Sequence, residues 1–377
     1  MNNISLYIHI PFCKSRCSYC SFFSTTQSLK SQENYFKALK IELSGYREIL
    51  KKRIIQTIYF GGGTPSLIQP KLIGKFLKYI NSNFDVSRDV ETTIECNPES
   101  ITRQKLQIYK QYGINRISVG LQAFQNKILK FLNRPHTIKQ FTAKYKLIEE
   151  FGFENTNIDL IFGIPTQTFT DWEQTLIQTI QLNPSHISCY SLETENNSLL
   201  AKKIRNKTIR LPSESLNLKM YYFAESKLNK AHYNQYEISN FAKKGFECKH
   251  NLSFWRCCDY IGLGAGAHSK IHNQHYQNIA NLHHYIKKTK NDECTKTNIV
   301  KLSKKDELLE SIILGLRLRD GLNLDTFQNK FKKSILTLYK NQITKLSKHK
   351  LVEVNHKYLK LTRKGMDLEN KVLEEFI

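Results

Sequence analysis

Short runs of β-branched and aromatic residues alternate with longer amphipathic stretches along the first half of the chain. The short runs predict strands at residues 6–10, 57–60, 92–95, 116–119, 155–160 and 186–191. The longer stretches repeat apolar residues at helical spacing and predict helices at 34–50, 71–82, 103–111, 138–151 and 170–182. Six successive β-then-α units predict a parallel sheet with helices packed outside it, either an open doubly wound sheet or a whole or partial TIM-like barrel.

Conspicuous polar and glycine-rich positions come directly after the predicted strands. Ligands bind at the carboxyl ends of the strands in such folds. The positions that follow or end successive strands are Cys13, Gly61 to Thr64, Glu95, Gln122 and Asp159. We therefore expect five loops to converge on one site.

The pattern changes from about residue 237. Irregular sequence rich in Gly, His and Trp follows, and it predicts a wrapping segment without a core of its own. Beyond residue 301, helices are predicted at 306–318, 324–332 and 335–347, then a short hairpin at 351–354 and 358–361 and a last helix. The chain thus divides into segments 1–235, 236–300 and 301–377, of which the last is winged-helix-like and favours protein packing over nucleic-acid binding.

The formal net charge of +24 raises the question of a polyanionic partner. The positive residues are mostly Lys, spread along the whole length, and accompany abundant Asn and Ile, which favours a compositionally biased, solvated surface. No signal peptide and no membrane span are predicted, so we expect a cytoplasmic protein without a nucleic-acid partner. Peripheral membrane association and a homodimer stay open.

Three of the nine cysteines lie within eight residues, at Cys13, Cys17 and Cys20. In a reducing compartment ligation is favoured over disulfides. A structural zinc ion would need a fourth ligand, which His9 could supply. A cubane iron-sulfur cluster held by three cysteines would instead leave one iron open for an exogenous ligand, as a catalytic cluster requires.

The cysteine motif opens an ordered series that resembles the oxygen-independent coproporphyrinogen III oxidase-like family of radical S-adenosylmethionine (SAM) proteins. The matching stretches are Tyr7 to Cys13 with Cys17 and Cys20, Phe60 to Ser66, Glu95 to Pro98, Ile117 to Gln122, Asn133 with Arg134, Asn157 to Pro165, Gly315 to Arg317, and Asp320 with Gly321. The resemblance implies a partial (β/α)6 TIM-like radical SAM barrel with a C-terminal winged-helix-like helical domain.

The resemblance also implies the site residues. Cys13, Cys17 and Cys20 would ligate a 4Fe-4S cluster, and SAM would chelate its fourth iron. The implied SAM contacts are Tyr7, Gly62, Gly63, Thr64, Glu95, Gln122, Arg134 and Asp159. Two alternatives stay open: Tyr7 as a barrel-lining aromatic, and Arg134 with Asp159 as an ordinary ion pair. No catalytic residue is assigned.

Two features favour the heme-chaperone branch of this family. The oxidases carry a fourth cysteine two residues after the third, where this chain has Phe22. His250 to Trp255 resembles a heme-associated motif of that branch, with Phe254 in place of a tyrosine. His250 would ligate heme iron and Trp255 would stack on the porphyrin; a hydrogen-bonded core histidine, or ligation by Cys248, are the alternatives.

The function expected from this resemblance is heme binding and delivery to unknown acceptor proteins, with 4Fe-4S, SAM and heme as cofactors. An enzyme, the oxygen-independent coproporphyrinogen III oxidase, is the main alternative, so enzymatic activity stays open. A third and weaker reading, a nucleic-acid modifier, rests on the charge alone.

Overall fold

Six parallel strands form the centre of the fold. The computed structural model describes residues 3–26, 29–194 and 198–377. The strands lie side by side in chain order as β1 (Asn3–Ile10), β2 (Ile54–Gly62), β3 (Val86–Cys96), β4 (Arg116–Gln122), β5 (Asn155–Phe162) and β6 (His186–Ser191). All six predicted strands are confirmed. Most are longer than predicted, because the hydrogen-bonded ladder continues past the apolar run.

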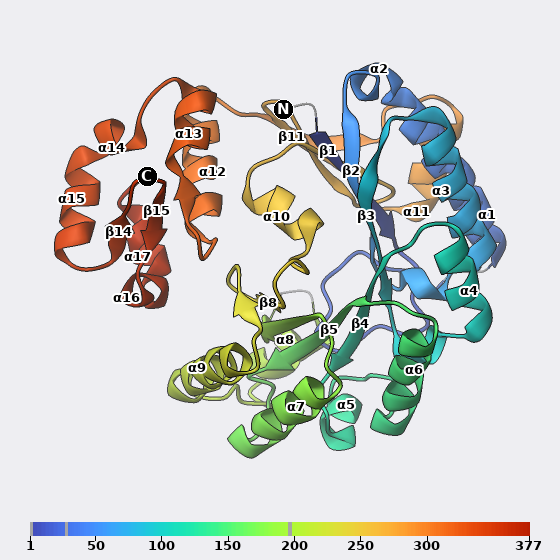
Figure 1. Ribbon diagram of the computed structural model, residues 1–377. Coiled ribbons are helices and arrows are strands. Elements are labelled where there is room, and N and C mark those ends of the chain that lie inside the picture. Colours follow the sequence, from blue (N-terminus) through green and yellow to red (C-terminus); the bar gives the residue numbers. More distant parts are fainter. Residues whose placement is uncertain (1–2, 27–28, 195–197) are drawn as a thin grey trace.

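Helices cover the outer face of this sheet (Figure 1). They are α1 (Leu29–Gly45), α3 (Pro70–Asn83), α4 (Arg103–Gln111), α6 (Ile138–Glu150), α7 (Phe169–Gln181) and α9 (Glu214–Lys230), with the shorter α2 (Arg47–Leu50), α5 (Asn126–Phe131) and α8 (Leu199–Arg205) between them. A sequential strand order with the helices outside is that of a barrel, whereas a doubly wound sheet carries helices on both faces. The sheet stays open because β6 pairs with β8 (Asn240–Ala242). The partial (β/α)6 barrel is confirmed, and the doubly wound alternative is wrong.

The segment expected to be irregular is instead largely regular, and this prediction is wrong. It contains β8, β9 (Tyr260–Leu263), β10 (His268–Ile271), β11 (Gln274–Asn278) and most of β12 (Lys296–Lys301), with α10 (Lys249–Trp255) and α11 (Leu282–Lys290); β7 (Asn234–Gln235) comes just before it. β9 pairs in parallel with β1, and β10 to β12 extend that edge in antiparallel fashion. Ile261 and Leu263 of this segment pack into the barrel core.

The C-terminal residues form a separate hydrophobic core around Ile312, Phe327, Leu346 and Leu359. The elements are α12 (Lys304–Leu316), β13 (Leu322–Asn323), α13 (Leu324–Phe331), α14 (Ile335–Leu338), α15 (Lys340–Lys348), β14 (Val352–Val354), β15 (Tyr358–Leu361), α16 (Arg363–Asp367) and α17 (Glu369–Glu374). The predicted hairpin is confirmed. The single helix predicted at 335–347 is broken at Tyr339, which leaves helical geometry with φ −118°.

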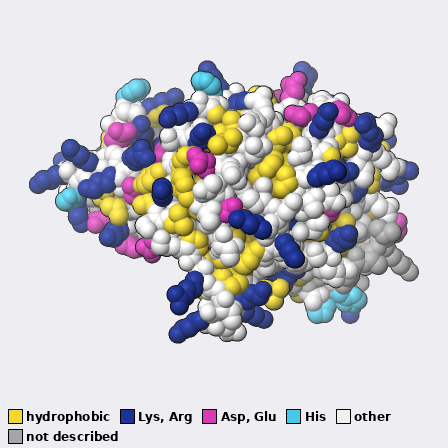
Figure 2. All heavy atoms as spheres, turned by 90° about the horizontal axis from the view of Figure 1, so that it is seen from below, with side chains coloured by type: hydrophobic (Ala, Val, Ile, Leu, Met, Phe, Trp, Pro, Cys, Tyr) yellow, Lys and Arg dark blue, Asp and Glu magenta, His cyan; other side chains and the backbone are white. Residues whose placement is uncertain are grey.

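Charge is dispersed on the face shown in Figure 2. Lys and Arg side chains lie scattered among neutral and hydrophobic ones, without one dominant basic patch. This distribution agrees with a solvated, compositionally biased surface on that face. No helix in the described part of the chain is long and apolar enough to span a membrane.

Candidate functional site

The cysteine loop follows β1 at the carboxyl ends of the strands. Cys13, Cys17 and Cys20 are free thiols, and each is partly buried. Burial raises the pKa of Cys13 and Cys20, and the neighbouring Cys17 raises both further. The three thiols are therefore close enough to interact, as three ligands of one cluster must be.

The structure gives His9 another role than zinc ligation. Its Nε2 lies 2.9 Å from the carbonyl oxygen of Phe23, and its Nδ1 lies 3.2 Å from the hydroxyl of Tyr7. Within the described residues, no three His, Cys, Asp or Glu side chains converge on a point that could hold one metal ion. Both ring nitrogens of His9 therefore have other partners, which weighs against His9 as a zinc ligand. A four-iron cluster is larger than one ion, so its ligands need not meet at one point.

Three glycines end β2 and lie directly against the cysteine loop. A Cβ atom at Gly63 would lie 2.9 Å from the Cys13 sulfur, and one at Gly62 would lie 2.6 Å from the His9 ring. Gly62 also has φ +109°, which residues with a side chain rarely adopt. Thr64 donates a hydrogen bond to the Cys13 sulfur over 3.6 Å. Backbone rather than side chain therefore forms the wall beside the thiols, and a cofactor can approach it closely.

Glu95 ends β3 beside this glycine loop. Its carboxylate accepts hydrogen bonds from the Tyr59 hydroxyl at 2.9 Å and from the backbone N–H of Gly62 at 3.2 Å. Burial, followed by the nearby charge of Asp159, raises the pKa of Glu95 to about 7. Tyr7 stacks on Tyr59 with ring centroids 6.2 Å apart. The structure thus brings Tyr7, Gly62 and Glu95 together, as the sequence predicts.

Arg134 contacts the cysteine loop rather than an acidic side chain. Its Nη1 donates to the Cys17 sulfur at 3.4 Å, and its Nη2 donates to Asn97 Oδ1 at 2.7 Å and to the Gly120 carbonyl at 2.9 Å. Asp159 instead accepts from Ser118 at 2.9 Å and from Asn157 at 2.8 Å. Since the described residues contain no Arg134–Asp159 ion pair, that alternative is wrong.

Gln122 lies at the end of β4, between these groups. Its φ of +76° is unusual for a residue with a side chain, and the register of β4 against β5 shifts at this point. Such outliers persist only where the surrounding structure holds them, and they cluster at functional sites. A Cβ atom at Gly120 would lie 2.9 Å from Gln122 Nε2 and 3.1 Å from Arg134 Nη2, so these two side chains are neighbours.

His250 does not lie with Trp255. It is the second residue of α10, and its Nδ1 lies 2.7 Å from the hydroxyl of Thr57, inside the barrel. Its ring stacks on Tyr59 with centroids 4.9 Å apart and lies 6.3 Å from the ring of Tyr7. Burial, then the charge of Arg116, lowers the pKa of His250 to about 3, so the imidazole is neutral. No described residue bonds its Nε2.

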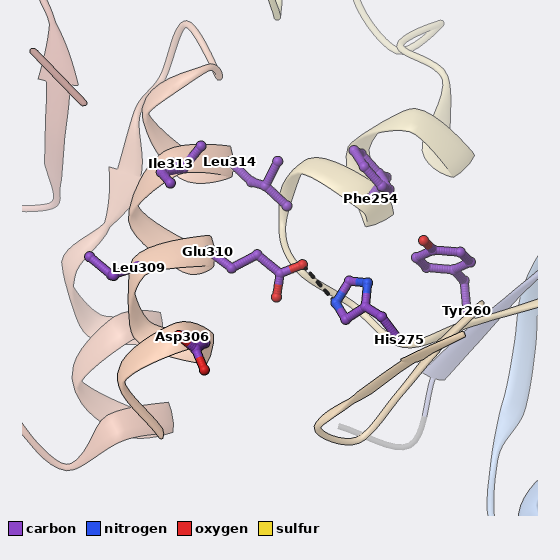
Figure 3. A pocket seen from close by; sticks show the side chains of 8 residues that line it. All are labelled: Phe254, Tyr260, His275, Asp306, Leu309, Glu310, Ile313 and Leu314. Atoms are coloured by element: carbon purple, nitrogen blue, oxygen red, sulfur yellow. Dashed lines mark ion pairs between the residues drawn. The ribbon is translucent and has the colours of Figure 1, made fainter. Parts of the chain in front are cut away.

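Trp255 and Phe254 face away from this ring. The Arg317 guanidinium lies over Trp255 at 5.9 Å from the ring centroid. Phe254 and Tyr260 line a cleft of about 370 Å³, opposite Glu310 and Leu314 of α12 (Figure 3). The predicted heme residues are therefore on two sides of α10.

Cys248, the alternative heme ligand, is buried and donates to Glu91 over 3.4 Å. Burial raises the pKa of this thiol to about 12. A protonated, enclosed thiol is a poor ligand, because the thiolate is the form that binds metal.

Sequence reasoning missed the polar interior of the barrel. Tyr7, Tyr59, Thr93 and Arg116 are in register on four adjacent strands, so their side chains share one inward-facing layer. We call the space that they face the lumen. The hydroxyl of Tyr236 and the ring of His186 lie 2.8 Å apart nearby. The available signal was the polar residues that interrupt the apolar strands at every second position.

Family models match both ends of the chain. The Radical SAM superfamily matches residues 7–177, and the HemN C-terminal domain matches residues 302–368. The first match includes all three cysteines of the loop, the glycine loop and Glu95.

Proteins named "Heme chaperone HemW" are similar to this chain, two of them over almost its whole length. The one from Lactococcus lactis subsp. lactis (strain IL1403) is 36% identical and covers 99% of this chain and 97% of its own. The one from Bacillus subtilis (strain 168) is 32% identical and covers 99% of both. The one from Escherichia coli (strain K12) is 36% identical over 71% of this chain and 70% of its own.

A solved structure shares the fold. Coproporphyrinogen III oxidase (HemN) from Escherichia coli, described as a radical SAM enzyme, superposes with a TM-score of 0.85 at 25% identity. The superposition covers 100% of this chain and 90% of that protein.

Proposed function

This chain belongs to the HemW family of radical SAM proteins, and from that membership we propose that it is a heme chaperone, which binds heme and transfers it to acceptor proteins. The observation that carries the proposal is the 36% identity to a HemW over 99% of this chain. Phe22 adds support, since it occupies the place of the oxidases' fourth cysteine and its side chain is 62% exposed. The proposal places the protein in the cytoplasm, where thiols stay reduced.

The residues of the cysteine loop fit a 4Fe-4S cluster. Cys13, Cys17 and Cys20 are three mutually interacting thiols beside a side-chain-free wall. We propose that they hold three irons and leave the fourth for SAM. When bound, cluster and SAM supply the reductive cleavage of SAM to a 5'-deoxyadenosyl radical.

The remaining assigned residues would position SAM. The backbone of Gly62 and Gly63 and the hydroxyl of Thr64 lie beside Cys13, and Glu95 would offset the positive charge of SAM. Gln122, Arg134 and Asp159 lie at the same mouth of the barrel. Arg134 would support SAM binding from beside the cluster, because its Nη1 and Nη2 donate hydrogen bonds to Cys17, Asn97 and Gly120.

We propose a division of labour among three segments. Residues 1–235 would hold the cluster and SAM, residues 236–300 would bind heme, and residues 301–377 would pack against the barrel as a protein-protein unit. His250 suits an axial heme ligand, because Thr57 fixes Nδ1 and leaves Nε2 without a partner among the described residues. Trp255, which lies on the other side of α10, would then contact heme from outside the lumen.

Oxidative decarboxylation of coproporphyrinogen III is the second candidate function. The superposition on the Escherichia coli oxidase over 100% of this chain favours it. Phe22 weighs against it, because the side chain there cannot replace a thiol.

Anaerobic reconstitution with iron and sulfide, followed by hemin titration, tests the proposal. Wild type and His250→Ala would be compared with a control, His232→Ala, whose side chain is exposed. We expect broad cluster absorption in all three proteins, and a Soret shift that only His250→Ala abolishes. Cluster absorption without any Soret shift in the wild type, together with vinyl products in an anaerobic oxidase assay, would favour the oxidase instead.

A further inference from the structure

Arg116 is a buried guanidinium that lacks a hydrogen-bonding partner. It is the first residue of β4, shares the inward-facing layer with Tyr59 and Thr93, and is 2% exposed. Its Nε is enclosed without any partner, and within the described residues no hydrogen bond or ion pair of this side chain is found. Buried charges in proteins are normally paired, because removing an ion from water is costly.

The acidic side chain that acts on Arg116 is already engaged. Burial lowers the pKa of Arg116, while Cys248 and then Glu91 raise it, but Glu91 makes no ion pair with the guanidinium. Its carboxylate accepts hydrogen bonds from the backbone N–H groups of Lys249 and His250 and from the thiol of Cys248. Glu91 therefore anchors the start of α10 and leaves the guanidinium without a direct counter-ion.

The groups around Arg116 are polar and largely buried. Tyr59, Tyr236 and His250 each keep some accessible surface, yet burial raises the pKa of both tyrosines well above the usual value. Thr93 Oγ1 and Asn155 Oδ1, which are in register with Arg116 on either side, are enclosed polar atoms without partners. Several unpaired polar atoms at one level of the lumen indicate a place for a polar ligand.

We propose that Arg116 receives a carboxylate group inside the barrel lumen, and, resting on the proposed function, that this carboxylate is a propionate of heme. The planar guanidinium fork matches a carboxylate in two parallel hydrogen bonds. Hydroxyl groups of tyrosine and the neutral ring of His250 border the same space. Since His250 is also the proposed iron ligand, iron and propionate would be held from adjacent positions. A free small carboxylate would offer Arg116 the same chemistry.

Hemin and hemin dimethyl ester distinguish these sources in the reconstituted full-length protein. We expect the wild type to bind hemin about ten to a hundred times more tightly than the ester, as for a hydrogen bond to a charged group. Arg116→Gln should bind both probes equally, at the affinity of the wild type for the ester. Arg256→Gln, which removes an exposed arginine at the end of α10, should keep the wild-type preference.

Sodium propionate tests the receptor without heme. At equal ionic strength it should raise the Tm of the wild type relative to sodium chloride, and it should leave the Tm of Arg116→Gln unchanged. Arg116→Lys keeps the positive charge and should retain part of the stabilisation by propionate. It replaces Arg116→Gln in this test if the glutamine variant does not fold. If propionate stabilises the wild type but esterification does not weaken binding, the carboxylate is not a heme propionate.

Other outcomes separate the two proposals. If the wild type binds neither hemin nor its ester, the heme-chaperone proposal is wrong. If propionate still stabilises the wild type but not Arg116→Gln, the carboxylate site at Arg116 stands on its own. Equal affinity for hemin and ester in every variant, together with no stabilisation by propionate, would overturn the receptor while heme binding stands.

Discussion

Glu95 is an acid whose ionisation opposes folding. Its pKa is raised from 4.5 to about 7, chiefly by burial and then by Asp159. Between these two values the folded state holds a proton that the unfolded state has lost, so stability falls as pH rises through that window. The cost is fully present above about pH 7 and, for this half-buried group, is roughly 1 to 3 kcal/mol.

Glu95→Gln should therefore stabilise the cofactor-free protein at about pH 8 and leave it nearly unchanged at about pH 4.5. The amide oxygen can still accept a hydrogen bond from Tyr59. Urea denaturation at both pH values measures the difference in the free energy of unfolding. Glu150→Gln, at an exposed surface pair with Arg103, is the control and should change little at either pH. A stabilisation of Glu95→Gln that is the same at both pH values would contradict the assignment.

Residue spacing predicted the mouth of the barrel better than its interior. Cys13, Gly62 and Glu95 follow successive strands, and in a parallel sheet such positions must meet at one edge. The partners of Arg134 were not predictable, because its contact with Cys17 joins two loops far apart in sequence. Arg116 was missed because its isolation depends on Glu91 being engaged by α10, which spacing along one strand does not encode.

Helix α10 borders the lumen through His250, and Glu91 anchors its first residues. The carboxylate accepts from the N–H of Lys249 at 3.0 Å and from that of His250 at 3.1 Å. We expect Glu91→Gln to destabilise the protein by about 1 to 2 kcal/mol, because the helix start loses a charged cap. Hydrogen exchange of the amides at 249–255 should accelerate about tenfold for each 1.4 kcal/mol of local stability lost.

Asp89→Asn is the matched control for α10. Asp89 pairs with the Lys249 side chain at 3.0 Å, on the same strand but in solvent, so its loss should cost less than about 1 kcal/mol. Acceleration that is equal in both variants, or that spreads over the whole barrel, would refute a specific anchoring role for Glu91.

Elements with strong periodicity were predicted well, and those at the edges of the sheet were not. On β1 to β6 every second residue is apolar and packs into the core, as Leu6 and Ile8 do on β1 and Ile117 on β4. β9 to β12 are only four to six residues long, and β12 is exposed along its length, so neither length nor alternation marked them. They exist because the exposed edge of β1 offers a row of backbone partners, beginning at Ser5 with Tyr260.

Ion pairs connect the large hydrophobic core of the barrel to the separate core of the C-terminal residues. Lys270 of β10 is 3% exposed, and its Nζ lies 2.5 Å from Glu310 of α12. His275 of β11 lies 3.1 Å from the other carboxylate oxygen (Figure 3). Arg319 pairs with Glu225 of α9 at 2.8 Å as a second connection. The C-terminal core was predictable from periodicity, whereas the pairs that dock it join residues about 35 to 94 positions apart.

Replacing Lys270 by Met should loosen this junction, because Glu310 would then keep only His275 as a partner in a partly buried place. Removing one member of a buried pair typically costs about 3 to 5 kcal/mol, whereas replacing both by apolar residues is often neutral. We therefore expect Lys270→Met and Glu310→Met to be destabilised singly, and the double variant to recover most of the loss.

The fluorescence of the two tryptophans distinguishes unfolding of the barrel from loosening of the junction, since Trp172 is buried in the barrel and Trp255 lies at the junction beside Arg317. In Lys270→Met the Trp255 fluorescence should change at lower urea concentration than that of Trp172, each followed in a variant with the other Trp replaced by Phe. Coincident transitions, with additive losses in the double variant, would mean that the pair does not control docking and that apolar contacts between α10 and α12 hold the two cores together.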